Sequence, residues 1–172
     1  MKILLIEDHK MVATSLKMSL EKENSISVDI INNFSASEID GIILDYDLLL
    51  IDINLTGIEG TINGLDLAEE LIEKYKNIKI VILTAYKLDF YIKRAKKIGC
   101  KGFISKEEET NKLIQNIKNI VLEDKTIFPE ENHMLEPLTK CELNIVRLYS
   151  NGMSRKQLAK ELNTNVRSLA VS

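Results

Sequence analysis

Cysteine and proline are scarce in this chain of 172 residues. Cys100 and Cys141 lie far apart, without a partner His or Cys at metal-ligand spacing, which excludes a disulfide framework and a cysteine-based metal site. No run of about 18 apolar residues occurs, so the sequence predicts no membrane span. With 45% hydrophobic and 28% charged residues, the composition is typical of a globular protein, not a disordered one. The N-terminus shows no secretory signal, and we therefore expect a cytoplasmic protein.

The only two prolines, Pro129 and Pro137, mark a break between two regions of the chain. Residues 123–136 are a mixed polar stretch without helical or strand period, which predicts a linker. The residues from Pro137 onward carry a formal charge of +4, although the whole chain carries −3. The sequence thus predicts an acidic domain over residues 1–122 and a small basic domain over residues 137–172. A basic domain favours contact with a polyanion.

Short apolar runs alternate with helix-like segments through the first 122 residues. This alternation predicts βα units, and therefore an α/β fold with a doubly wound sheet of five parallel strands. The predicted strands cover residues 2–6, 26–31, 47–53, 78–83 and 102–105. The predicted helices cover residues 11–23, 35–43, 64–74, 88–98 and 108–122.

Polar residues follow four of these strands, at the point where each apolar run ends. They are Glu7, Asp8, Asp52, Thr84 and Lys106. The carboxyl ends of parallel strands meet at one edge of the sheet, where open α/β sheets bind their ligands. Carboxylates, a hydroxyl and an ammonium group in one crevice suit a divalent metal ion and a phosphoryl group. The sequence therefore predicts a phosphorylatable switch.

The basic tail shows the signals of two helix starts. Each is a capping box, Thr139 with Glu142 and Ser154 with Gln157. Gly152 suits the end of the first of these helices. A short helix, a glycine-containing turn and a second short helix are typical of a helix-turn-helix unit. A third helix is predicted to begin shortly before the sequence ends, so we expect an incomplete all-α domain.

Four motifs in the first 122 residues resemble those of a response regulator receiver domain, and they stand in the same order. They are Glu7-Asp8-His9, Ile51-Asp52-Ile53-Asn54-Leu55, Leu83-Thr84-Ala85 and Gly102-Phe103-Ile104-Ser105-Lys106. The tail resembles the start of a LuxR-type helix-turn-helix domain at Leu138-Thr139-x-x-Glu142, Gly152-Met153-Ser154 and Leu158-Ala159-x-x-Leu162. On these motifs the chain is identified as a C-terminally truncated member of the NarL/FixJ class of two-component response regulators. This implies a flavodoxin-like receiver fold.

The resemblance implies that Asp52 accepts a phosphoryl group from a sensor histidine kinase. A carboxylate is already anionic near neutral pH and needs no general base. The resemblance further implies a Mg²⁺ ion held by Glu7, Asp8, Asp52 and the backbone carbonyl of Asn54. It assigns no enzymatic activity beyond self-catalysed phosphotransfer and slow autodephosphorylation.

A second group of residues would connect phosphorylation with the rest of the molecule. By resemblance, Lys106 pairs with the phosphoryl group, Thr84 moves toward it, and the ring of Phe103 follows. Phe103 is equally well interpreted as a core residue. His9 is interpreted as a loop or helix-start residue and not as a metal ligand. Asn54 and Tyr86 occupy the positions that, in the family, tune the lifetime of the acyl phosphate.

The resemblance also implies partners. The full-length protein would bind DNA, here through Arg155, Lys156, Lys160 and Arg167, whereas the chain as given would bind weakly or not at all. Phosphorylation would promote a homodimer through the fourth helix and fifth strand. We expect no contact with membranes.

Two features depart from the pattern of receiver domains, and two alternative functions stay open. Thr56 stands where receivers have a proline, and residues 57–63 form a longer loop than usual beside the expected site. One alternative is a phosphorylatable regulator that acts through protein contacts and has a non-functional DNA-binding tail. The other is a phosphohydrolase of the haloacid-dehalogenase type, because Asp52-x-Asn54-x-Thr56 resembles its nucleophile loop. Asn54 disfavours it, since that chemistry needs a second acid there.

Overall fold

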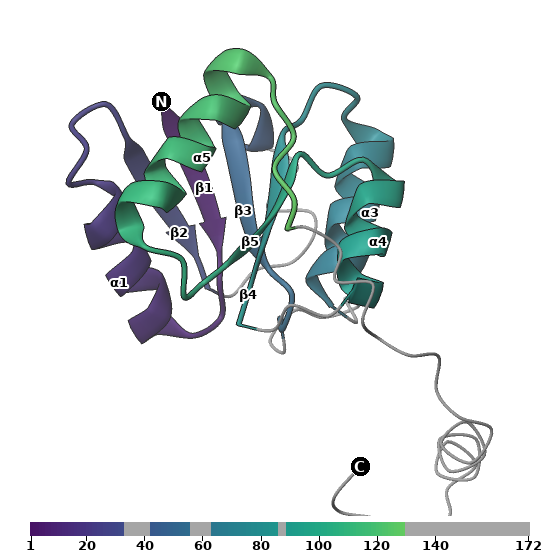
Figure 1. The fold of residues 1–172 in the computed structure, drawn as a ribbon, viewed down its shortest axis with the longest axis horizontal. Coiled ribbons are helices and arrows are strands. Elements are labelled where there is room, and N and C mark those ends of the chain that lie inside the picture. Colours follow the sequence, from purple (N-terminus) through teal and green to yellow (C-terminus); the bar gives the residue numbers. More distant parts are fainter. Residues whose placement is uncertain (33–41, 56–62, 86–88, 130–172) are drawn as a thin grey trace, which may run out of the picture. The chain divides into compact units, whose positions relative to one another are not determined.

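The computed structural model describes residues 1–32, 42–55, 63–85 and 89–129 (Figure 1). The chain divides into two compact units, Met1–Glu130 and Glu131–Ser172. The predicted helix-turn-helix, with its four candidate DNA-binding residues, lies outside the described residues, as does Cys141. The account below therefore concerns the first unit.

Five parallel strands form one sheet, in the order β2-β1-β3-β4-β5. They are β1 (Lys2–Ile6), β2 (Ser27–Ile31), β3 (Leu48–Asp52), β4 (Ile80–Thr84) and β5 (Gly102–Ser105). This is the strand order of the flavodoxin-like doubly wound fold, in which the order reverses between β1 and β3. The predicted fold class is confirmed, with strand bounds that differ from the prediction by a few residues.

Helices cover both faces of the sheet (Figure 1). They are α1 (Lys10–Leu20), α3 (Gly64–Lys74), α4 (Asp89–Ile98) and α5 (Thr110–Glu123), with the short 3-10 helix η1 at Ile43–Asp45. The helix predicted over 35–43 falls mainly on residues 33–41, which lie outside the described residues. Among the described residues, no helix has the length and apolar character needed to cross a membrane.

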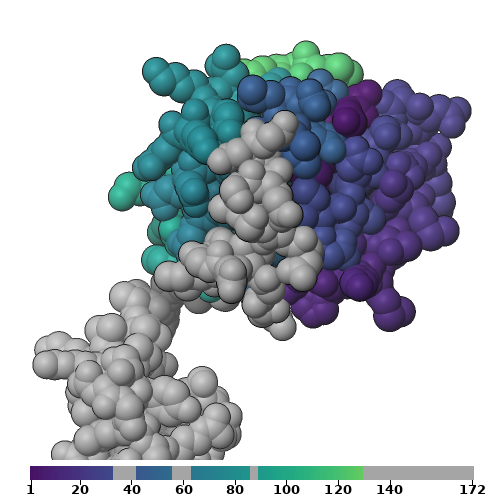
Figure 2. All heavy atoms as spheres, turned by 180° about the vertical axis from the view of Figure 1, so that it is seen from behind, coloured from purple at the N-terminus to yellow at the C-terminus, as the bar shows by residue number. Residues whose placement is uncertain are grey.

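The two faces of the sheet carry separate apolar cores. In β3, Leu49 and Ile51 belong to the core under α3 and α4, whereas Leu48 and Leu50 belong to the core under α1 and α5. Successive side chains of a strand point to opposite faces, so a strand that is covered on both must be apolar at nearly every position. Seen from behind, the α1–β2 region (purple) and α3 (teal) form opposite sides of the unit (Figure 2).

Candidate functional site

The register of the sheet brings the polar strand ends together. Ile6 of β1 pairs with Ile51 of β3, Asp52 with Leu83 of β4, and Thr84 with Ser105 of β5. The residues that end or follow these four strands therefore meet at the carboxyl edge of the sheet. This is the convergence that the sequence predicts.

A cluster of carboxylates lies at this edge. Glu7, Asp8, His9 and Asp52 each offer a ligand atom, and these atoms all lie within 4.8 Å of one another. Glu7 is fully buried and Asp52 is 1% exposed. Buried carboxylates are costly unless they are paired with a cation or hydrogen-bonded.

Lys106 supplies the positive charge. Its Nζ lies 2.9 Å from Asp52 Oδ2 and 2.5 Å from Glu7 Oε2. Burial by itself would lower the pKa of this ammonium, but the hydrogen bonds with Glu7 and Asp52 outweigh it and the pKa is raised. Glu108, one of the acids that follow Lys106, pairs with Lys112 instead at 2.7 Å. Lys106 is thus part of the site and not a surface lysine held by its neighbours.

The second oxygen of Asp52 is the atom that a cation would satisfy. Asp52 Oδ1 is buried and has no hydrogen-bond partner within the described part of the chain. An orphaned buried acceptor beside two further acids is a donor set of hard oxygens, which Mg²⁺ prefers. The residues present therefore fit the Mg²⁺ ion that is expected from the sequence.

His9 also belongs to this cluster, although the sequence predicted no chemical role for it. It is the N-cap residue of α1, which confirms its interpretation as a helix-start residue. Its Nδ1 lies 3.0 Å from Asp8 Oδ1 and 3.3 Å from Glu7 Oε1, and its backbone N–H donates to Glu7 Oε1 at 3.2 Å. Its position directly after Glu7-Asp8 was the available signal. Because Mg²⁺ prefers oxygen ligands, we assign His9 no ligand role.

Four candidate residues from the sequence remain, namely Thr84, Phe103, Asn54 and Tyr86. Thr84 ends β4 and Phe103 lies in β5, and each is 1% exposed. Phe103 belongs to the core under α3 and α4, as its core interpretation requires. Asn54 is exposed just after β3. Tyr86 lies outside the described residues.

Gly64 is a second residue near the site to which the sequence analysis assigned no role. Its backbone N–H donates to the carbonyl of Ile53 at 2.8 Å, which joins the two ends of the long loop after β3. Asn63 caps α3, because its side chain accepts from the backbone N–H groups of Leu65 and Asp66 at 2.9 and 3.1 Å. An Asn-Gly pair directly before an amphipathic run was the sequence signal for this cap.

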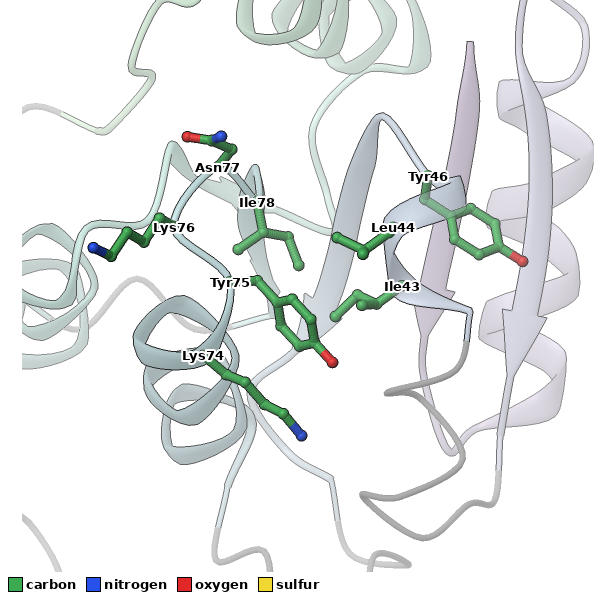
Figure 3. Close-up of a pocket in the computed structure, with 8 residues that line it drawn as sticks. All are labelled: Ile43, Leu44, Tyr46, Lys74, Tyr75, Lys76, Asn77 and Ile78. Carbon is green, nitrogen blue, oxygen red and sulfur yellow. The ribbon is translucent and has the colours of Figure 1, made fainter.

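A surface pocket of about 400 Å³ lies elsewhere on the unit. Its lining residues come from η1 and the residue that follows it, which precede β3, and from the end of α3 and the turn before β4; they are Ile43, Leu44, Tyr46, Lys74, Tyr75, Lys76, Asn77 and Ile78. Figure 3 shows the side chains of Ile43 and Leu44 pointing toward Tyr75 and Ile78. The pocket is thus at the amino ends of the strands, away from the carboxylates.

Buried acids with one lysine, at the switch point of a five-stranded parallel sheet, define a receiver-type site. The family model that matches residues 3–118 is the response regulator receiver domain, and the chain belongs to this family. Similar proteins include the transcriptional regulatory protein ComA of Bacillus subtilis, 28% identical over 189 residues, with 99% of this chain and 87% of ComA covered. The nitrate/nitrite response regulator protein NarP of Escherichia coli is 25% identical, with 98% of this chain and 83% of NarP covered.

The solved structures of the RcsB response regulator share the fold. That of Salmonella typhimurium RcsB has a TM-score of 0.67 at 18% identity and covers 99% of this chain and 86% of that one. A structure of RcsB dimers bound to DNA reaches 0.70 at the same identity and coverage. The chain is accordingly a response regulator whose relatives along nearly its whole length are regulators of the NarL/LuxR type.

Proposed function

We propose that this response regulator is switched by phosphorylation of Asp52, with a sensor histidine kinase as the donor. The supporting observation is the triad of buried Glu7, buried Asp52 and half-buried Lys106, in which one oxygen of Asp52 has no hydrogen-bond partner among the described residues.

Each residue of the triad then has a chemical task. A carboxylate oxygen of Asp52 attacks phosphorus, and the bond between phosphorus and the donor imidazole breaks. Lys106 brings positive charge to a place where two anions must meet, and as a point charge it can turn to a phosphoryl oxygen. Glu7 keeps Lys106 at the site, because it accepts from the same Nζ.

The metal belongs to the same proposal. Asp8, Asp52 and the backbone carbonyl of Asn54 would hold Mg²⁺, and Glu7 would act through water. When bound, Mg²⁺ would offset the repulsion between the anions and stabilise negative charge on the transferred group. Both oxygens of Glu7 already have protein partners, Lys106 and the backbone N–H of His9, which favours an indirect role.

The switch is proposed to pass through Thr84 and Phe103. Both are buried, and Thr84 pairs with Ser105 on the strand that also carries Phe103. A hydroxyl that turns toward a new phosphoryl group would change the packing of β5 and α4. Asn54 and Tyr86 are proposed to tune how long the acyl phosphate survives.

The output is proposed to be regulation of transcription in the cytoplasm. In this proposal residues 1–122 are the receiver, 123–136 the linker and 137–172 part of a LuxR-type DNA-binding domain, with Arg155, Lys156, Lys160 and Arg167 as candidate DNA contacts in the full-length protein. A homodimer formed on phosphorylation would read a two-fold DNA site. The RcsB dimers bound to DNA are the relatives that support this part. A regulator that acts through protein contacts alone is not favoured.

The test is intact mass after incubation with acetyl phosphate and Mg²⁺, for the wild type and Asp52→Asn side by side. We expect a gain of about 80 Da in the wild type only, the mass of one phosphoryl group. A wild-type sample in EDTA should show little gain. An equal mass gain in Asp52→Asn would show that another residue accepts the phosphoryl group. No mass gain in the wild type would contradict the proposal.

A further inference from the structure

The chain that follows α5 lies along the outer edge of β5, although the sequence predicted a linker there. We call residues 125–128 the strap. The backbone N–H of Phe103 donates to the carbonyl of Ile127 at 2.9 Å, and the N–H of Ile127 donates to the carbonyl of Lys101 at 2.9 Å. Gly102 and Ile127 form a parallel bridge. Figure 1 shows this green segment descending beside β5.

Two strap side chains contact opposite faces of the sheet. Ile127 packs against the core under α1 and α5, whereas Phe128 packs against the core under α3 and α4, which contains Phe103. This alternation is that of a strand, so the strap extends the sheet beyond β5. The Nζ of Lys96 lies 5.4 Å from the centre of the Phe128 ring, which links the strap to α4.

The turn that delivers the strap is anchored by three charges. Asp124 adopts the left-handed conformation, with a φ of 51°, at the end of α5. Its Oδ1 lies 3.1 Å from Lys101 Nζ and 3.2 Å from Lys79 Nζ, and these ammonium groups hold the pKa of its carboxyl below the usual range. Lys79 also donates to the carbonyls of Ile120 and Val121, at 3.2 and 2.9 Å. The chain therefore leaves α5 in a defined direction.

Close approach of the strap requires a glycine in β5. A Cβ at Gly102 would lie 3.0 Å from the carbonyl oxygen of Ile127 and 3.2 Å from Ile120 Cδ1. Contacts of this length are tighter than ordinary van der Waals contact. Gly102 thus provides the space that lets the strap pair with the edge of the strand.

β5 connects the strap with the carboxylate site. It is four residues long, begins at Gly102 beside the strap, and is followed directly by Lys106. The N–H of Lys106 donates to the carbonyl of Thr84 at 2.8 Å, while its side chain holds Asp52. At about 3.3 Å per residue, the four residue steps from Gly102 to Lys106 span roughly 13 Å of extended chain between the strap and the site.

We propose that the strap is a latch that phosphorylation loosens, so that the state of Asp52 is passed through β5 to the chain beyond residue 129. This inference rests on the proposed phosphorylation of Asp52. A phosphoryl group on Asp52 takes one carboxylate partner from Lys106 and replaces it with a new anion, so Lys106 and β5 must adjust. Phe103, whose N–H holds Ile127, lies within that strand.

The strap is the element that should yield first. Among the described residues, two backbone hydrogen bonds join the strap to the edge of β5, and Ile127 and Phe128 each pack against the core on one face, whereas the other edge of β5 pairs with β4 along its whole length. Elements with few buried contacts open at a lower free energy than the body of the fold. A small change in β5 therefore detaches the strap more often before it disturbs the pairing of the strands.

Amide hydrogen exchange measured by NMR tests the latch. In the protein treated with acetyl phosphate and Mg²⁺, we expect the amides of Ile127 and Phe103 to exchange at least about fivefold faster than in the untreated protein, the lower end of allosteric couplings. The amide of Leu49, bonded to Lys79 O within the sheet, serves as the internal reference and should not change. Asp52→Asn should show no acceleration.

A strap variant provides the converse test. Phe128→Ala removes the contact with α4 and the core and should open the strap without phosphorylation. Because coupling is reciprocal, this variant should bind beryllium fluoride, a phosphoryl mimic, more tightly than the wild type, by at most the factor by which phosphorylation accelerates the exchange of Ile127. Lys125→Ala is the matched control, since that side chain is exposed and pairs with Glu123. Equal affinity of Phe128→Ala and the wild type would overturn the coupling.

The two proposals fail in different ways. A mass gain at Asp52 with unchanged exchange at Ile127 and Phe103 would overturn the latch and leave phosphorylation in place. No mass gain under the same conditions would overturn both.

Discussion

Gly64 and Asp52 are in backbone contact: a Cβ added to Gly64 would lie 1.9 Å from the carbonyl oxygen of Asp52. The first turn of α3 thus rests directly on the residue that carries the proposed phosphoryl group. With the hydrogen bond from Gly64 to Ile53, this contact fixes the end of β3 at the base of the long loop.

Gly64→Ala is expected to destabilise the protein and disturb the site. The new Cβ would lie 1.9 Å from the carbonyl oxygen of Asp52, which is far inside van der Waals contact, so either α3 or this carbonyl must move. Overpacking of this kind costs about 1–3 kcal/mol. Urea denaturation measures the loss, and intact mass after acetyl phosphate treatment measures phosphorylation. Glu70→Ala, an exposed position of the same helix, should change stability by less than about 0.5 kcal/mol. A Gly64→Ala variant as stable as the wild type would contradict the contact.

Asn63→Ala should cost about 1 kcal/mol of unfolding free energy, the usual effect of losing an N-cap side chain. The Asn63 side chain accepts two backbone hydrogen bonds that an alanine cannot replace. Asn63→Asp keeps an acceptor and adds a negative charge at the N-terminus of the helix, so its stability should remain near that of the wild type. If both variants lose the same free energy in urea denaturation, the capping explanation is wrong.

Lys106→Met should reduce stability and increase the affinity for Mg²⁺. The variant leaves the buried carboxylates of Glu7 and Asp52 without their cation, which costs about 3 kcal/mol. A divalent ion then meets no competing ammonium, so Mg²⁺ should raise the melting temperature more in the variant than in the wild type.

Lys112→Met is the matched control for Lys106→Met, because Lys112 is exposed and pairs with Glu108 outside the carboxylate cluster. Its response to Mg²⁺ should equal that of the wild type. Weaker Mg²⁺ stabilisation of Lys106→Met than of this control would show that Lys106 supports the ion and does not compete with it.

Cys100 is expected to resist alkylation in the native protein. Burial raises the pKa of its thiol to about 12, so the reactive thiolate is scarce near neutral pH. Mass spectrometry of peptides after iodoacetamide treatment should find Cys100 modified in urea and unmodified without it. Rapid native labelling would contradict the burial.

The same raised pKa sets the direction of a pH effect. The folded state holds the thiol proton more tightly than the unfolded state, so this group contributes stability at low pH and loses it as the pH rises from about 9 toward 12. Over that range the wild type should lose unfolding free energy relative to Cys100→Ala. A constant difference between the two proteins would refute the linkage.

Much of the fold follows from local patterns. The strand from Leu48 to Asp52 was predictable because an unbroken apolar run suits a strand that is covered on both faces. The helix from Gly64 to Lys74 was predictable because its apolar residues recur at helical spacing, and the predicted bounds match. The identity of the polar residues at the strand ends was also visible, because they interrupt apolar runs.

The sequence alone therefore determined the α/β class, the residues available to the site and their approximate places at strand ends. Only the tertiary structure decided which of them meet: Lys106 and Glu7 are 99 positions apart, and their pairing depends on a strand order that brings β1 beside β3 and β4 beside β5. The pairing of the strap with β5 and the contact of Gly64 with Asp52 were decided in the same way. The spacing of apolar residues along the sequence indicates which face of a helix or strand is buried. Contacts between helices and strands depend on how those faces pack together.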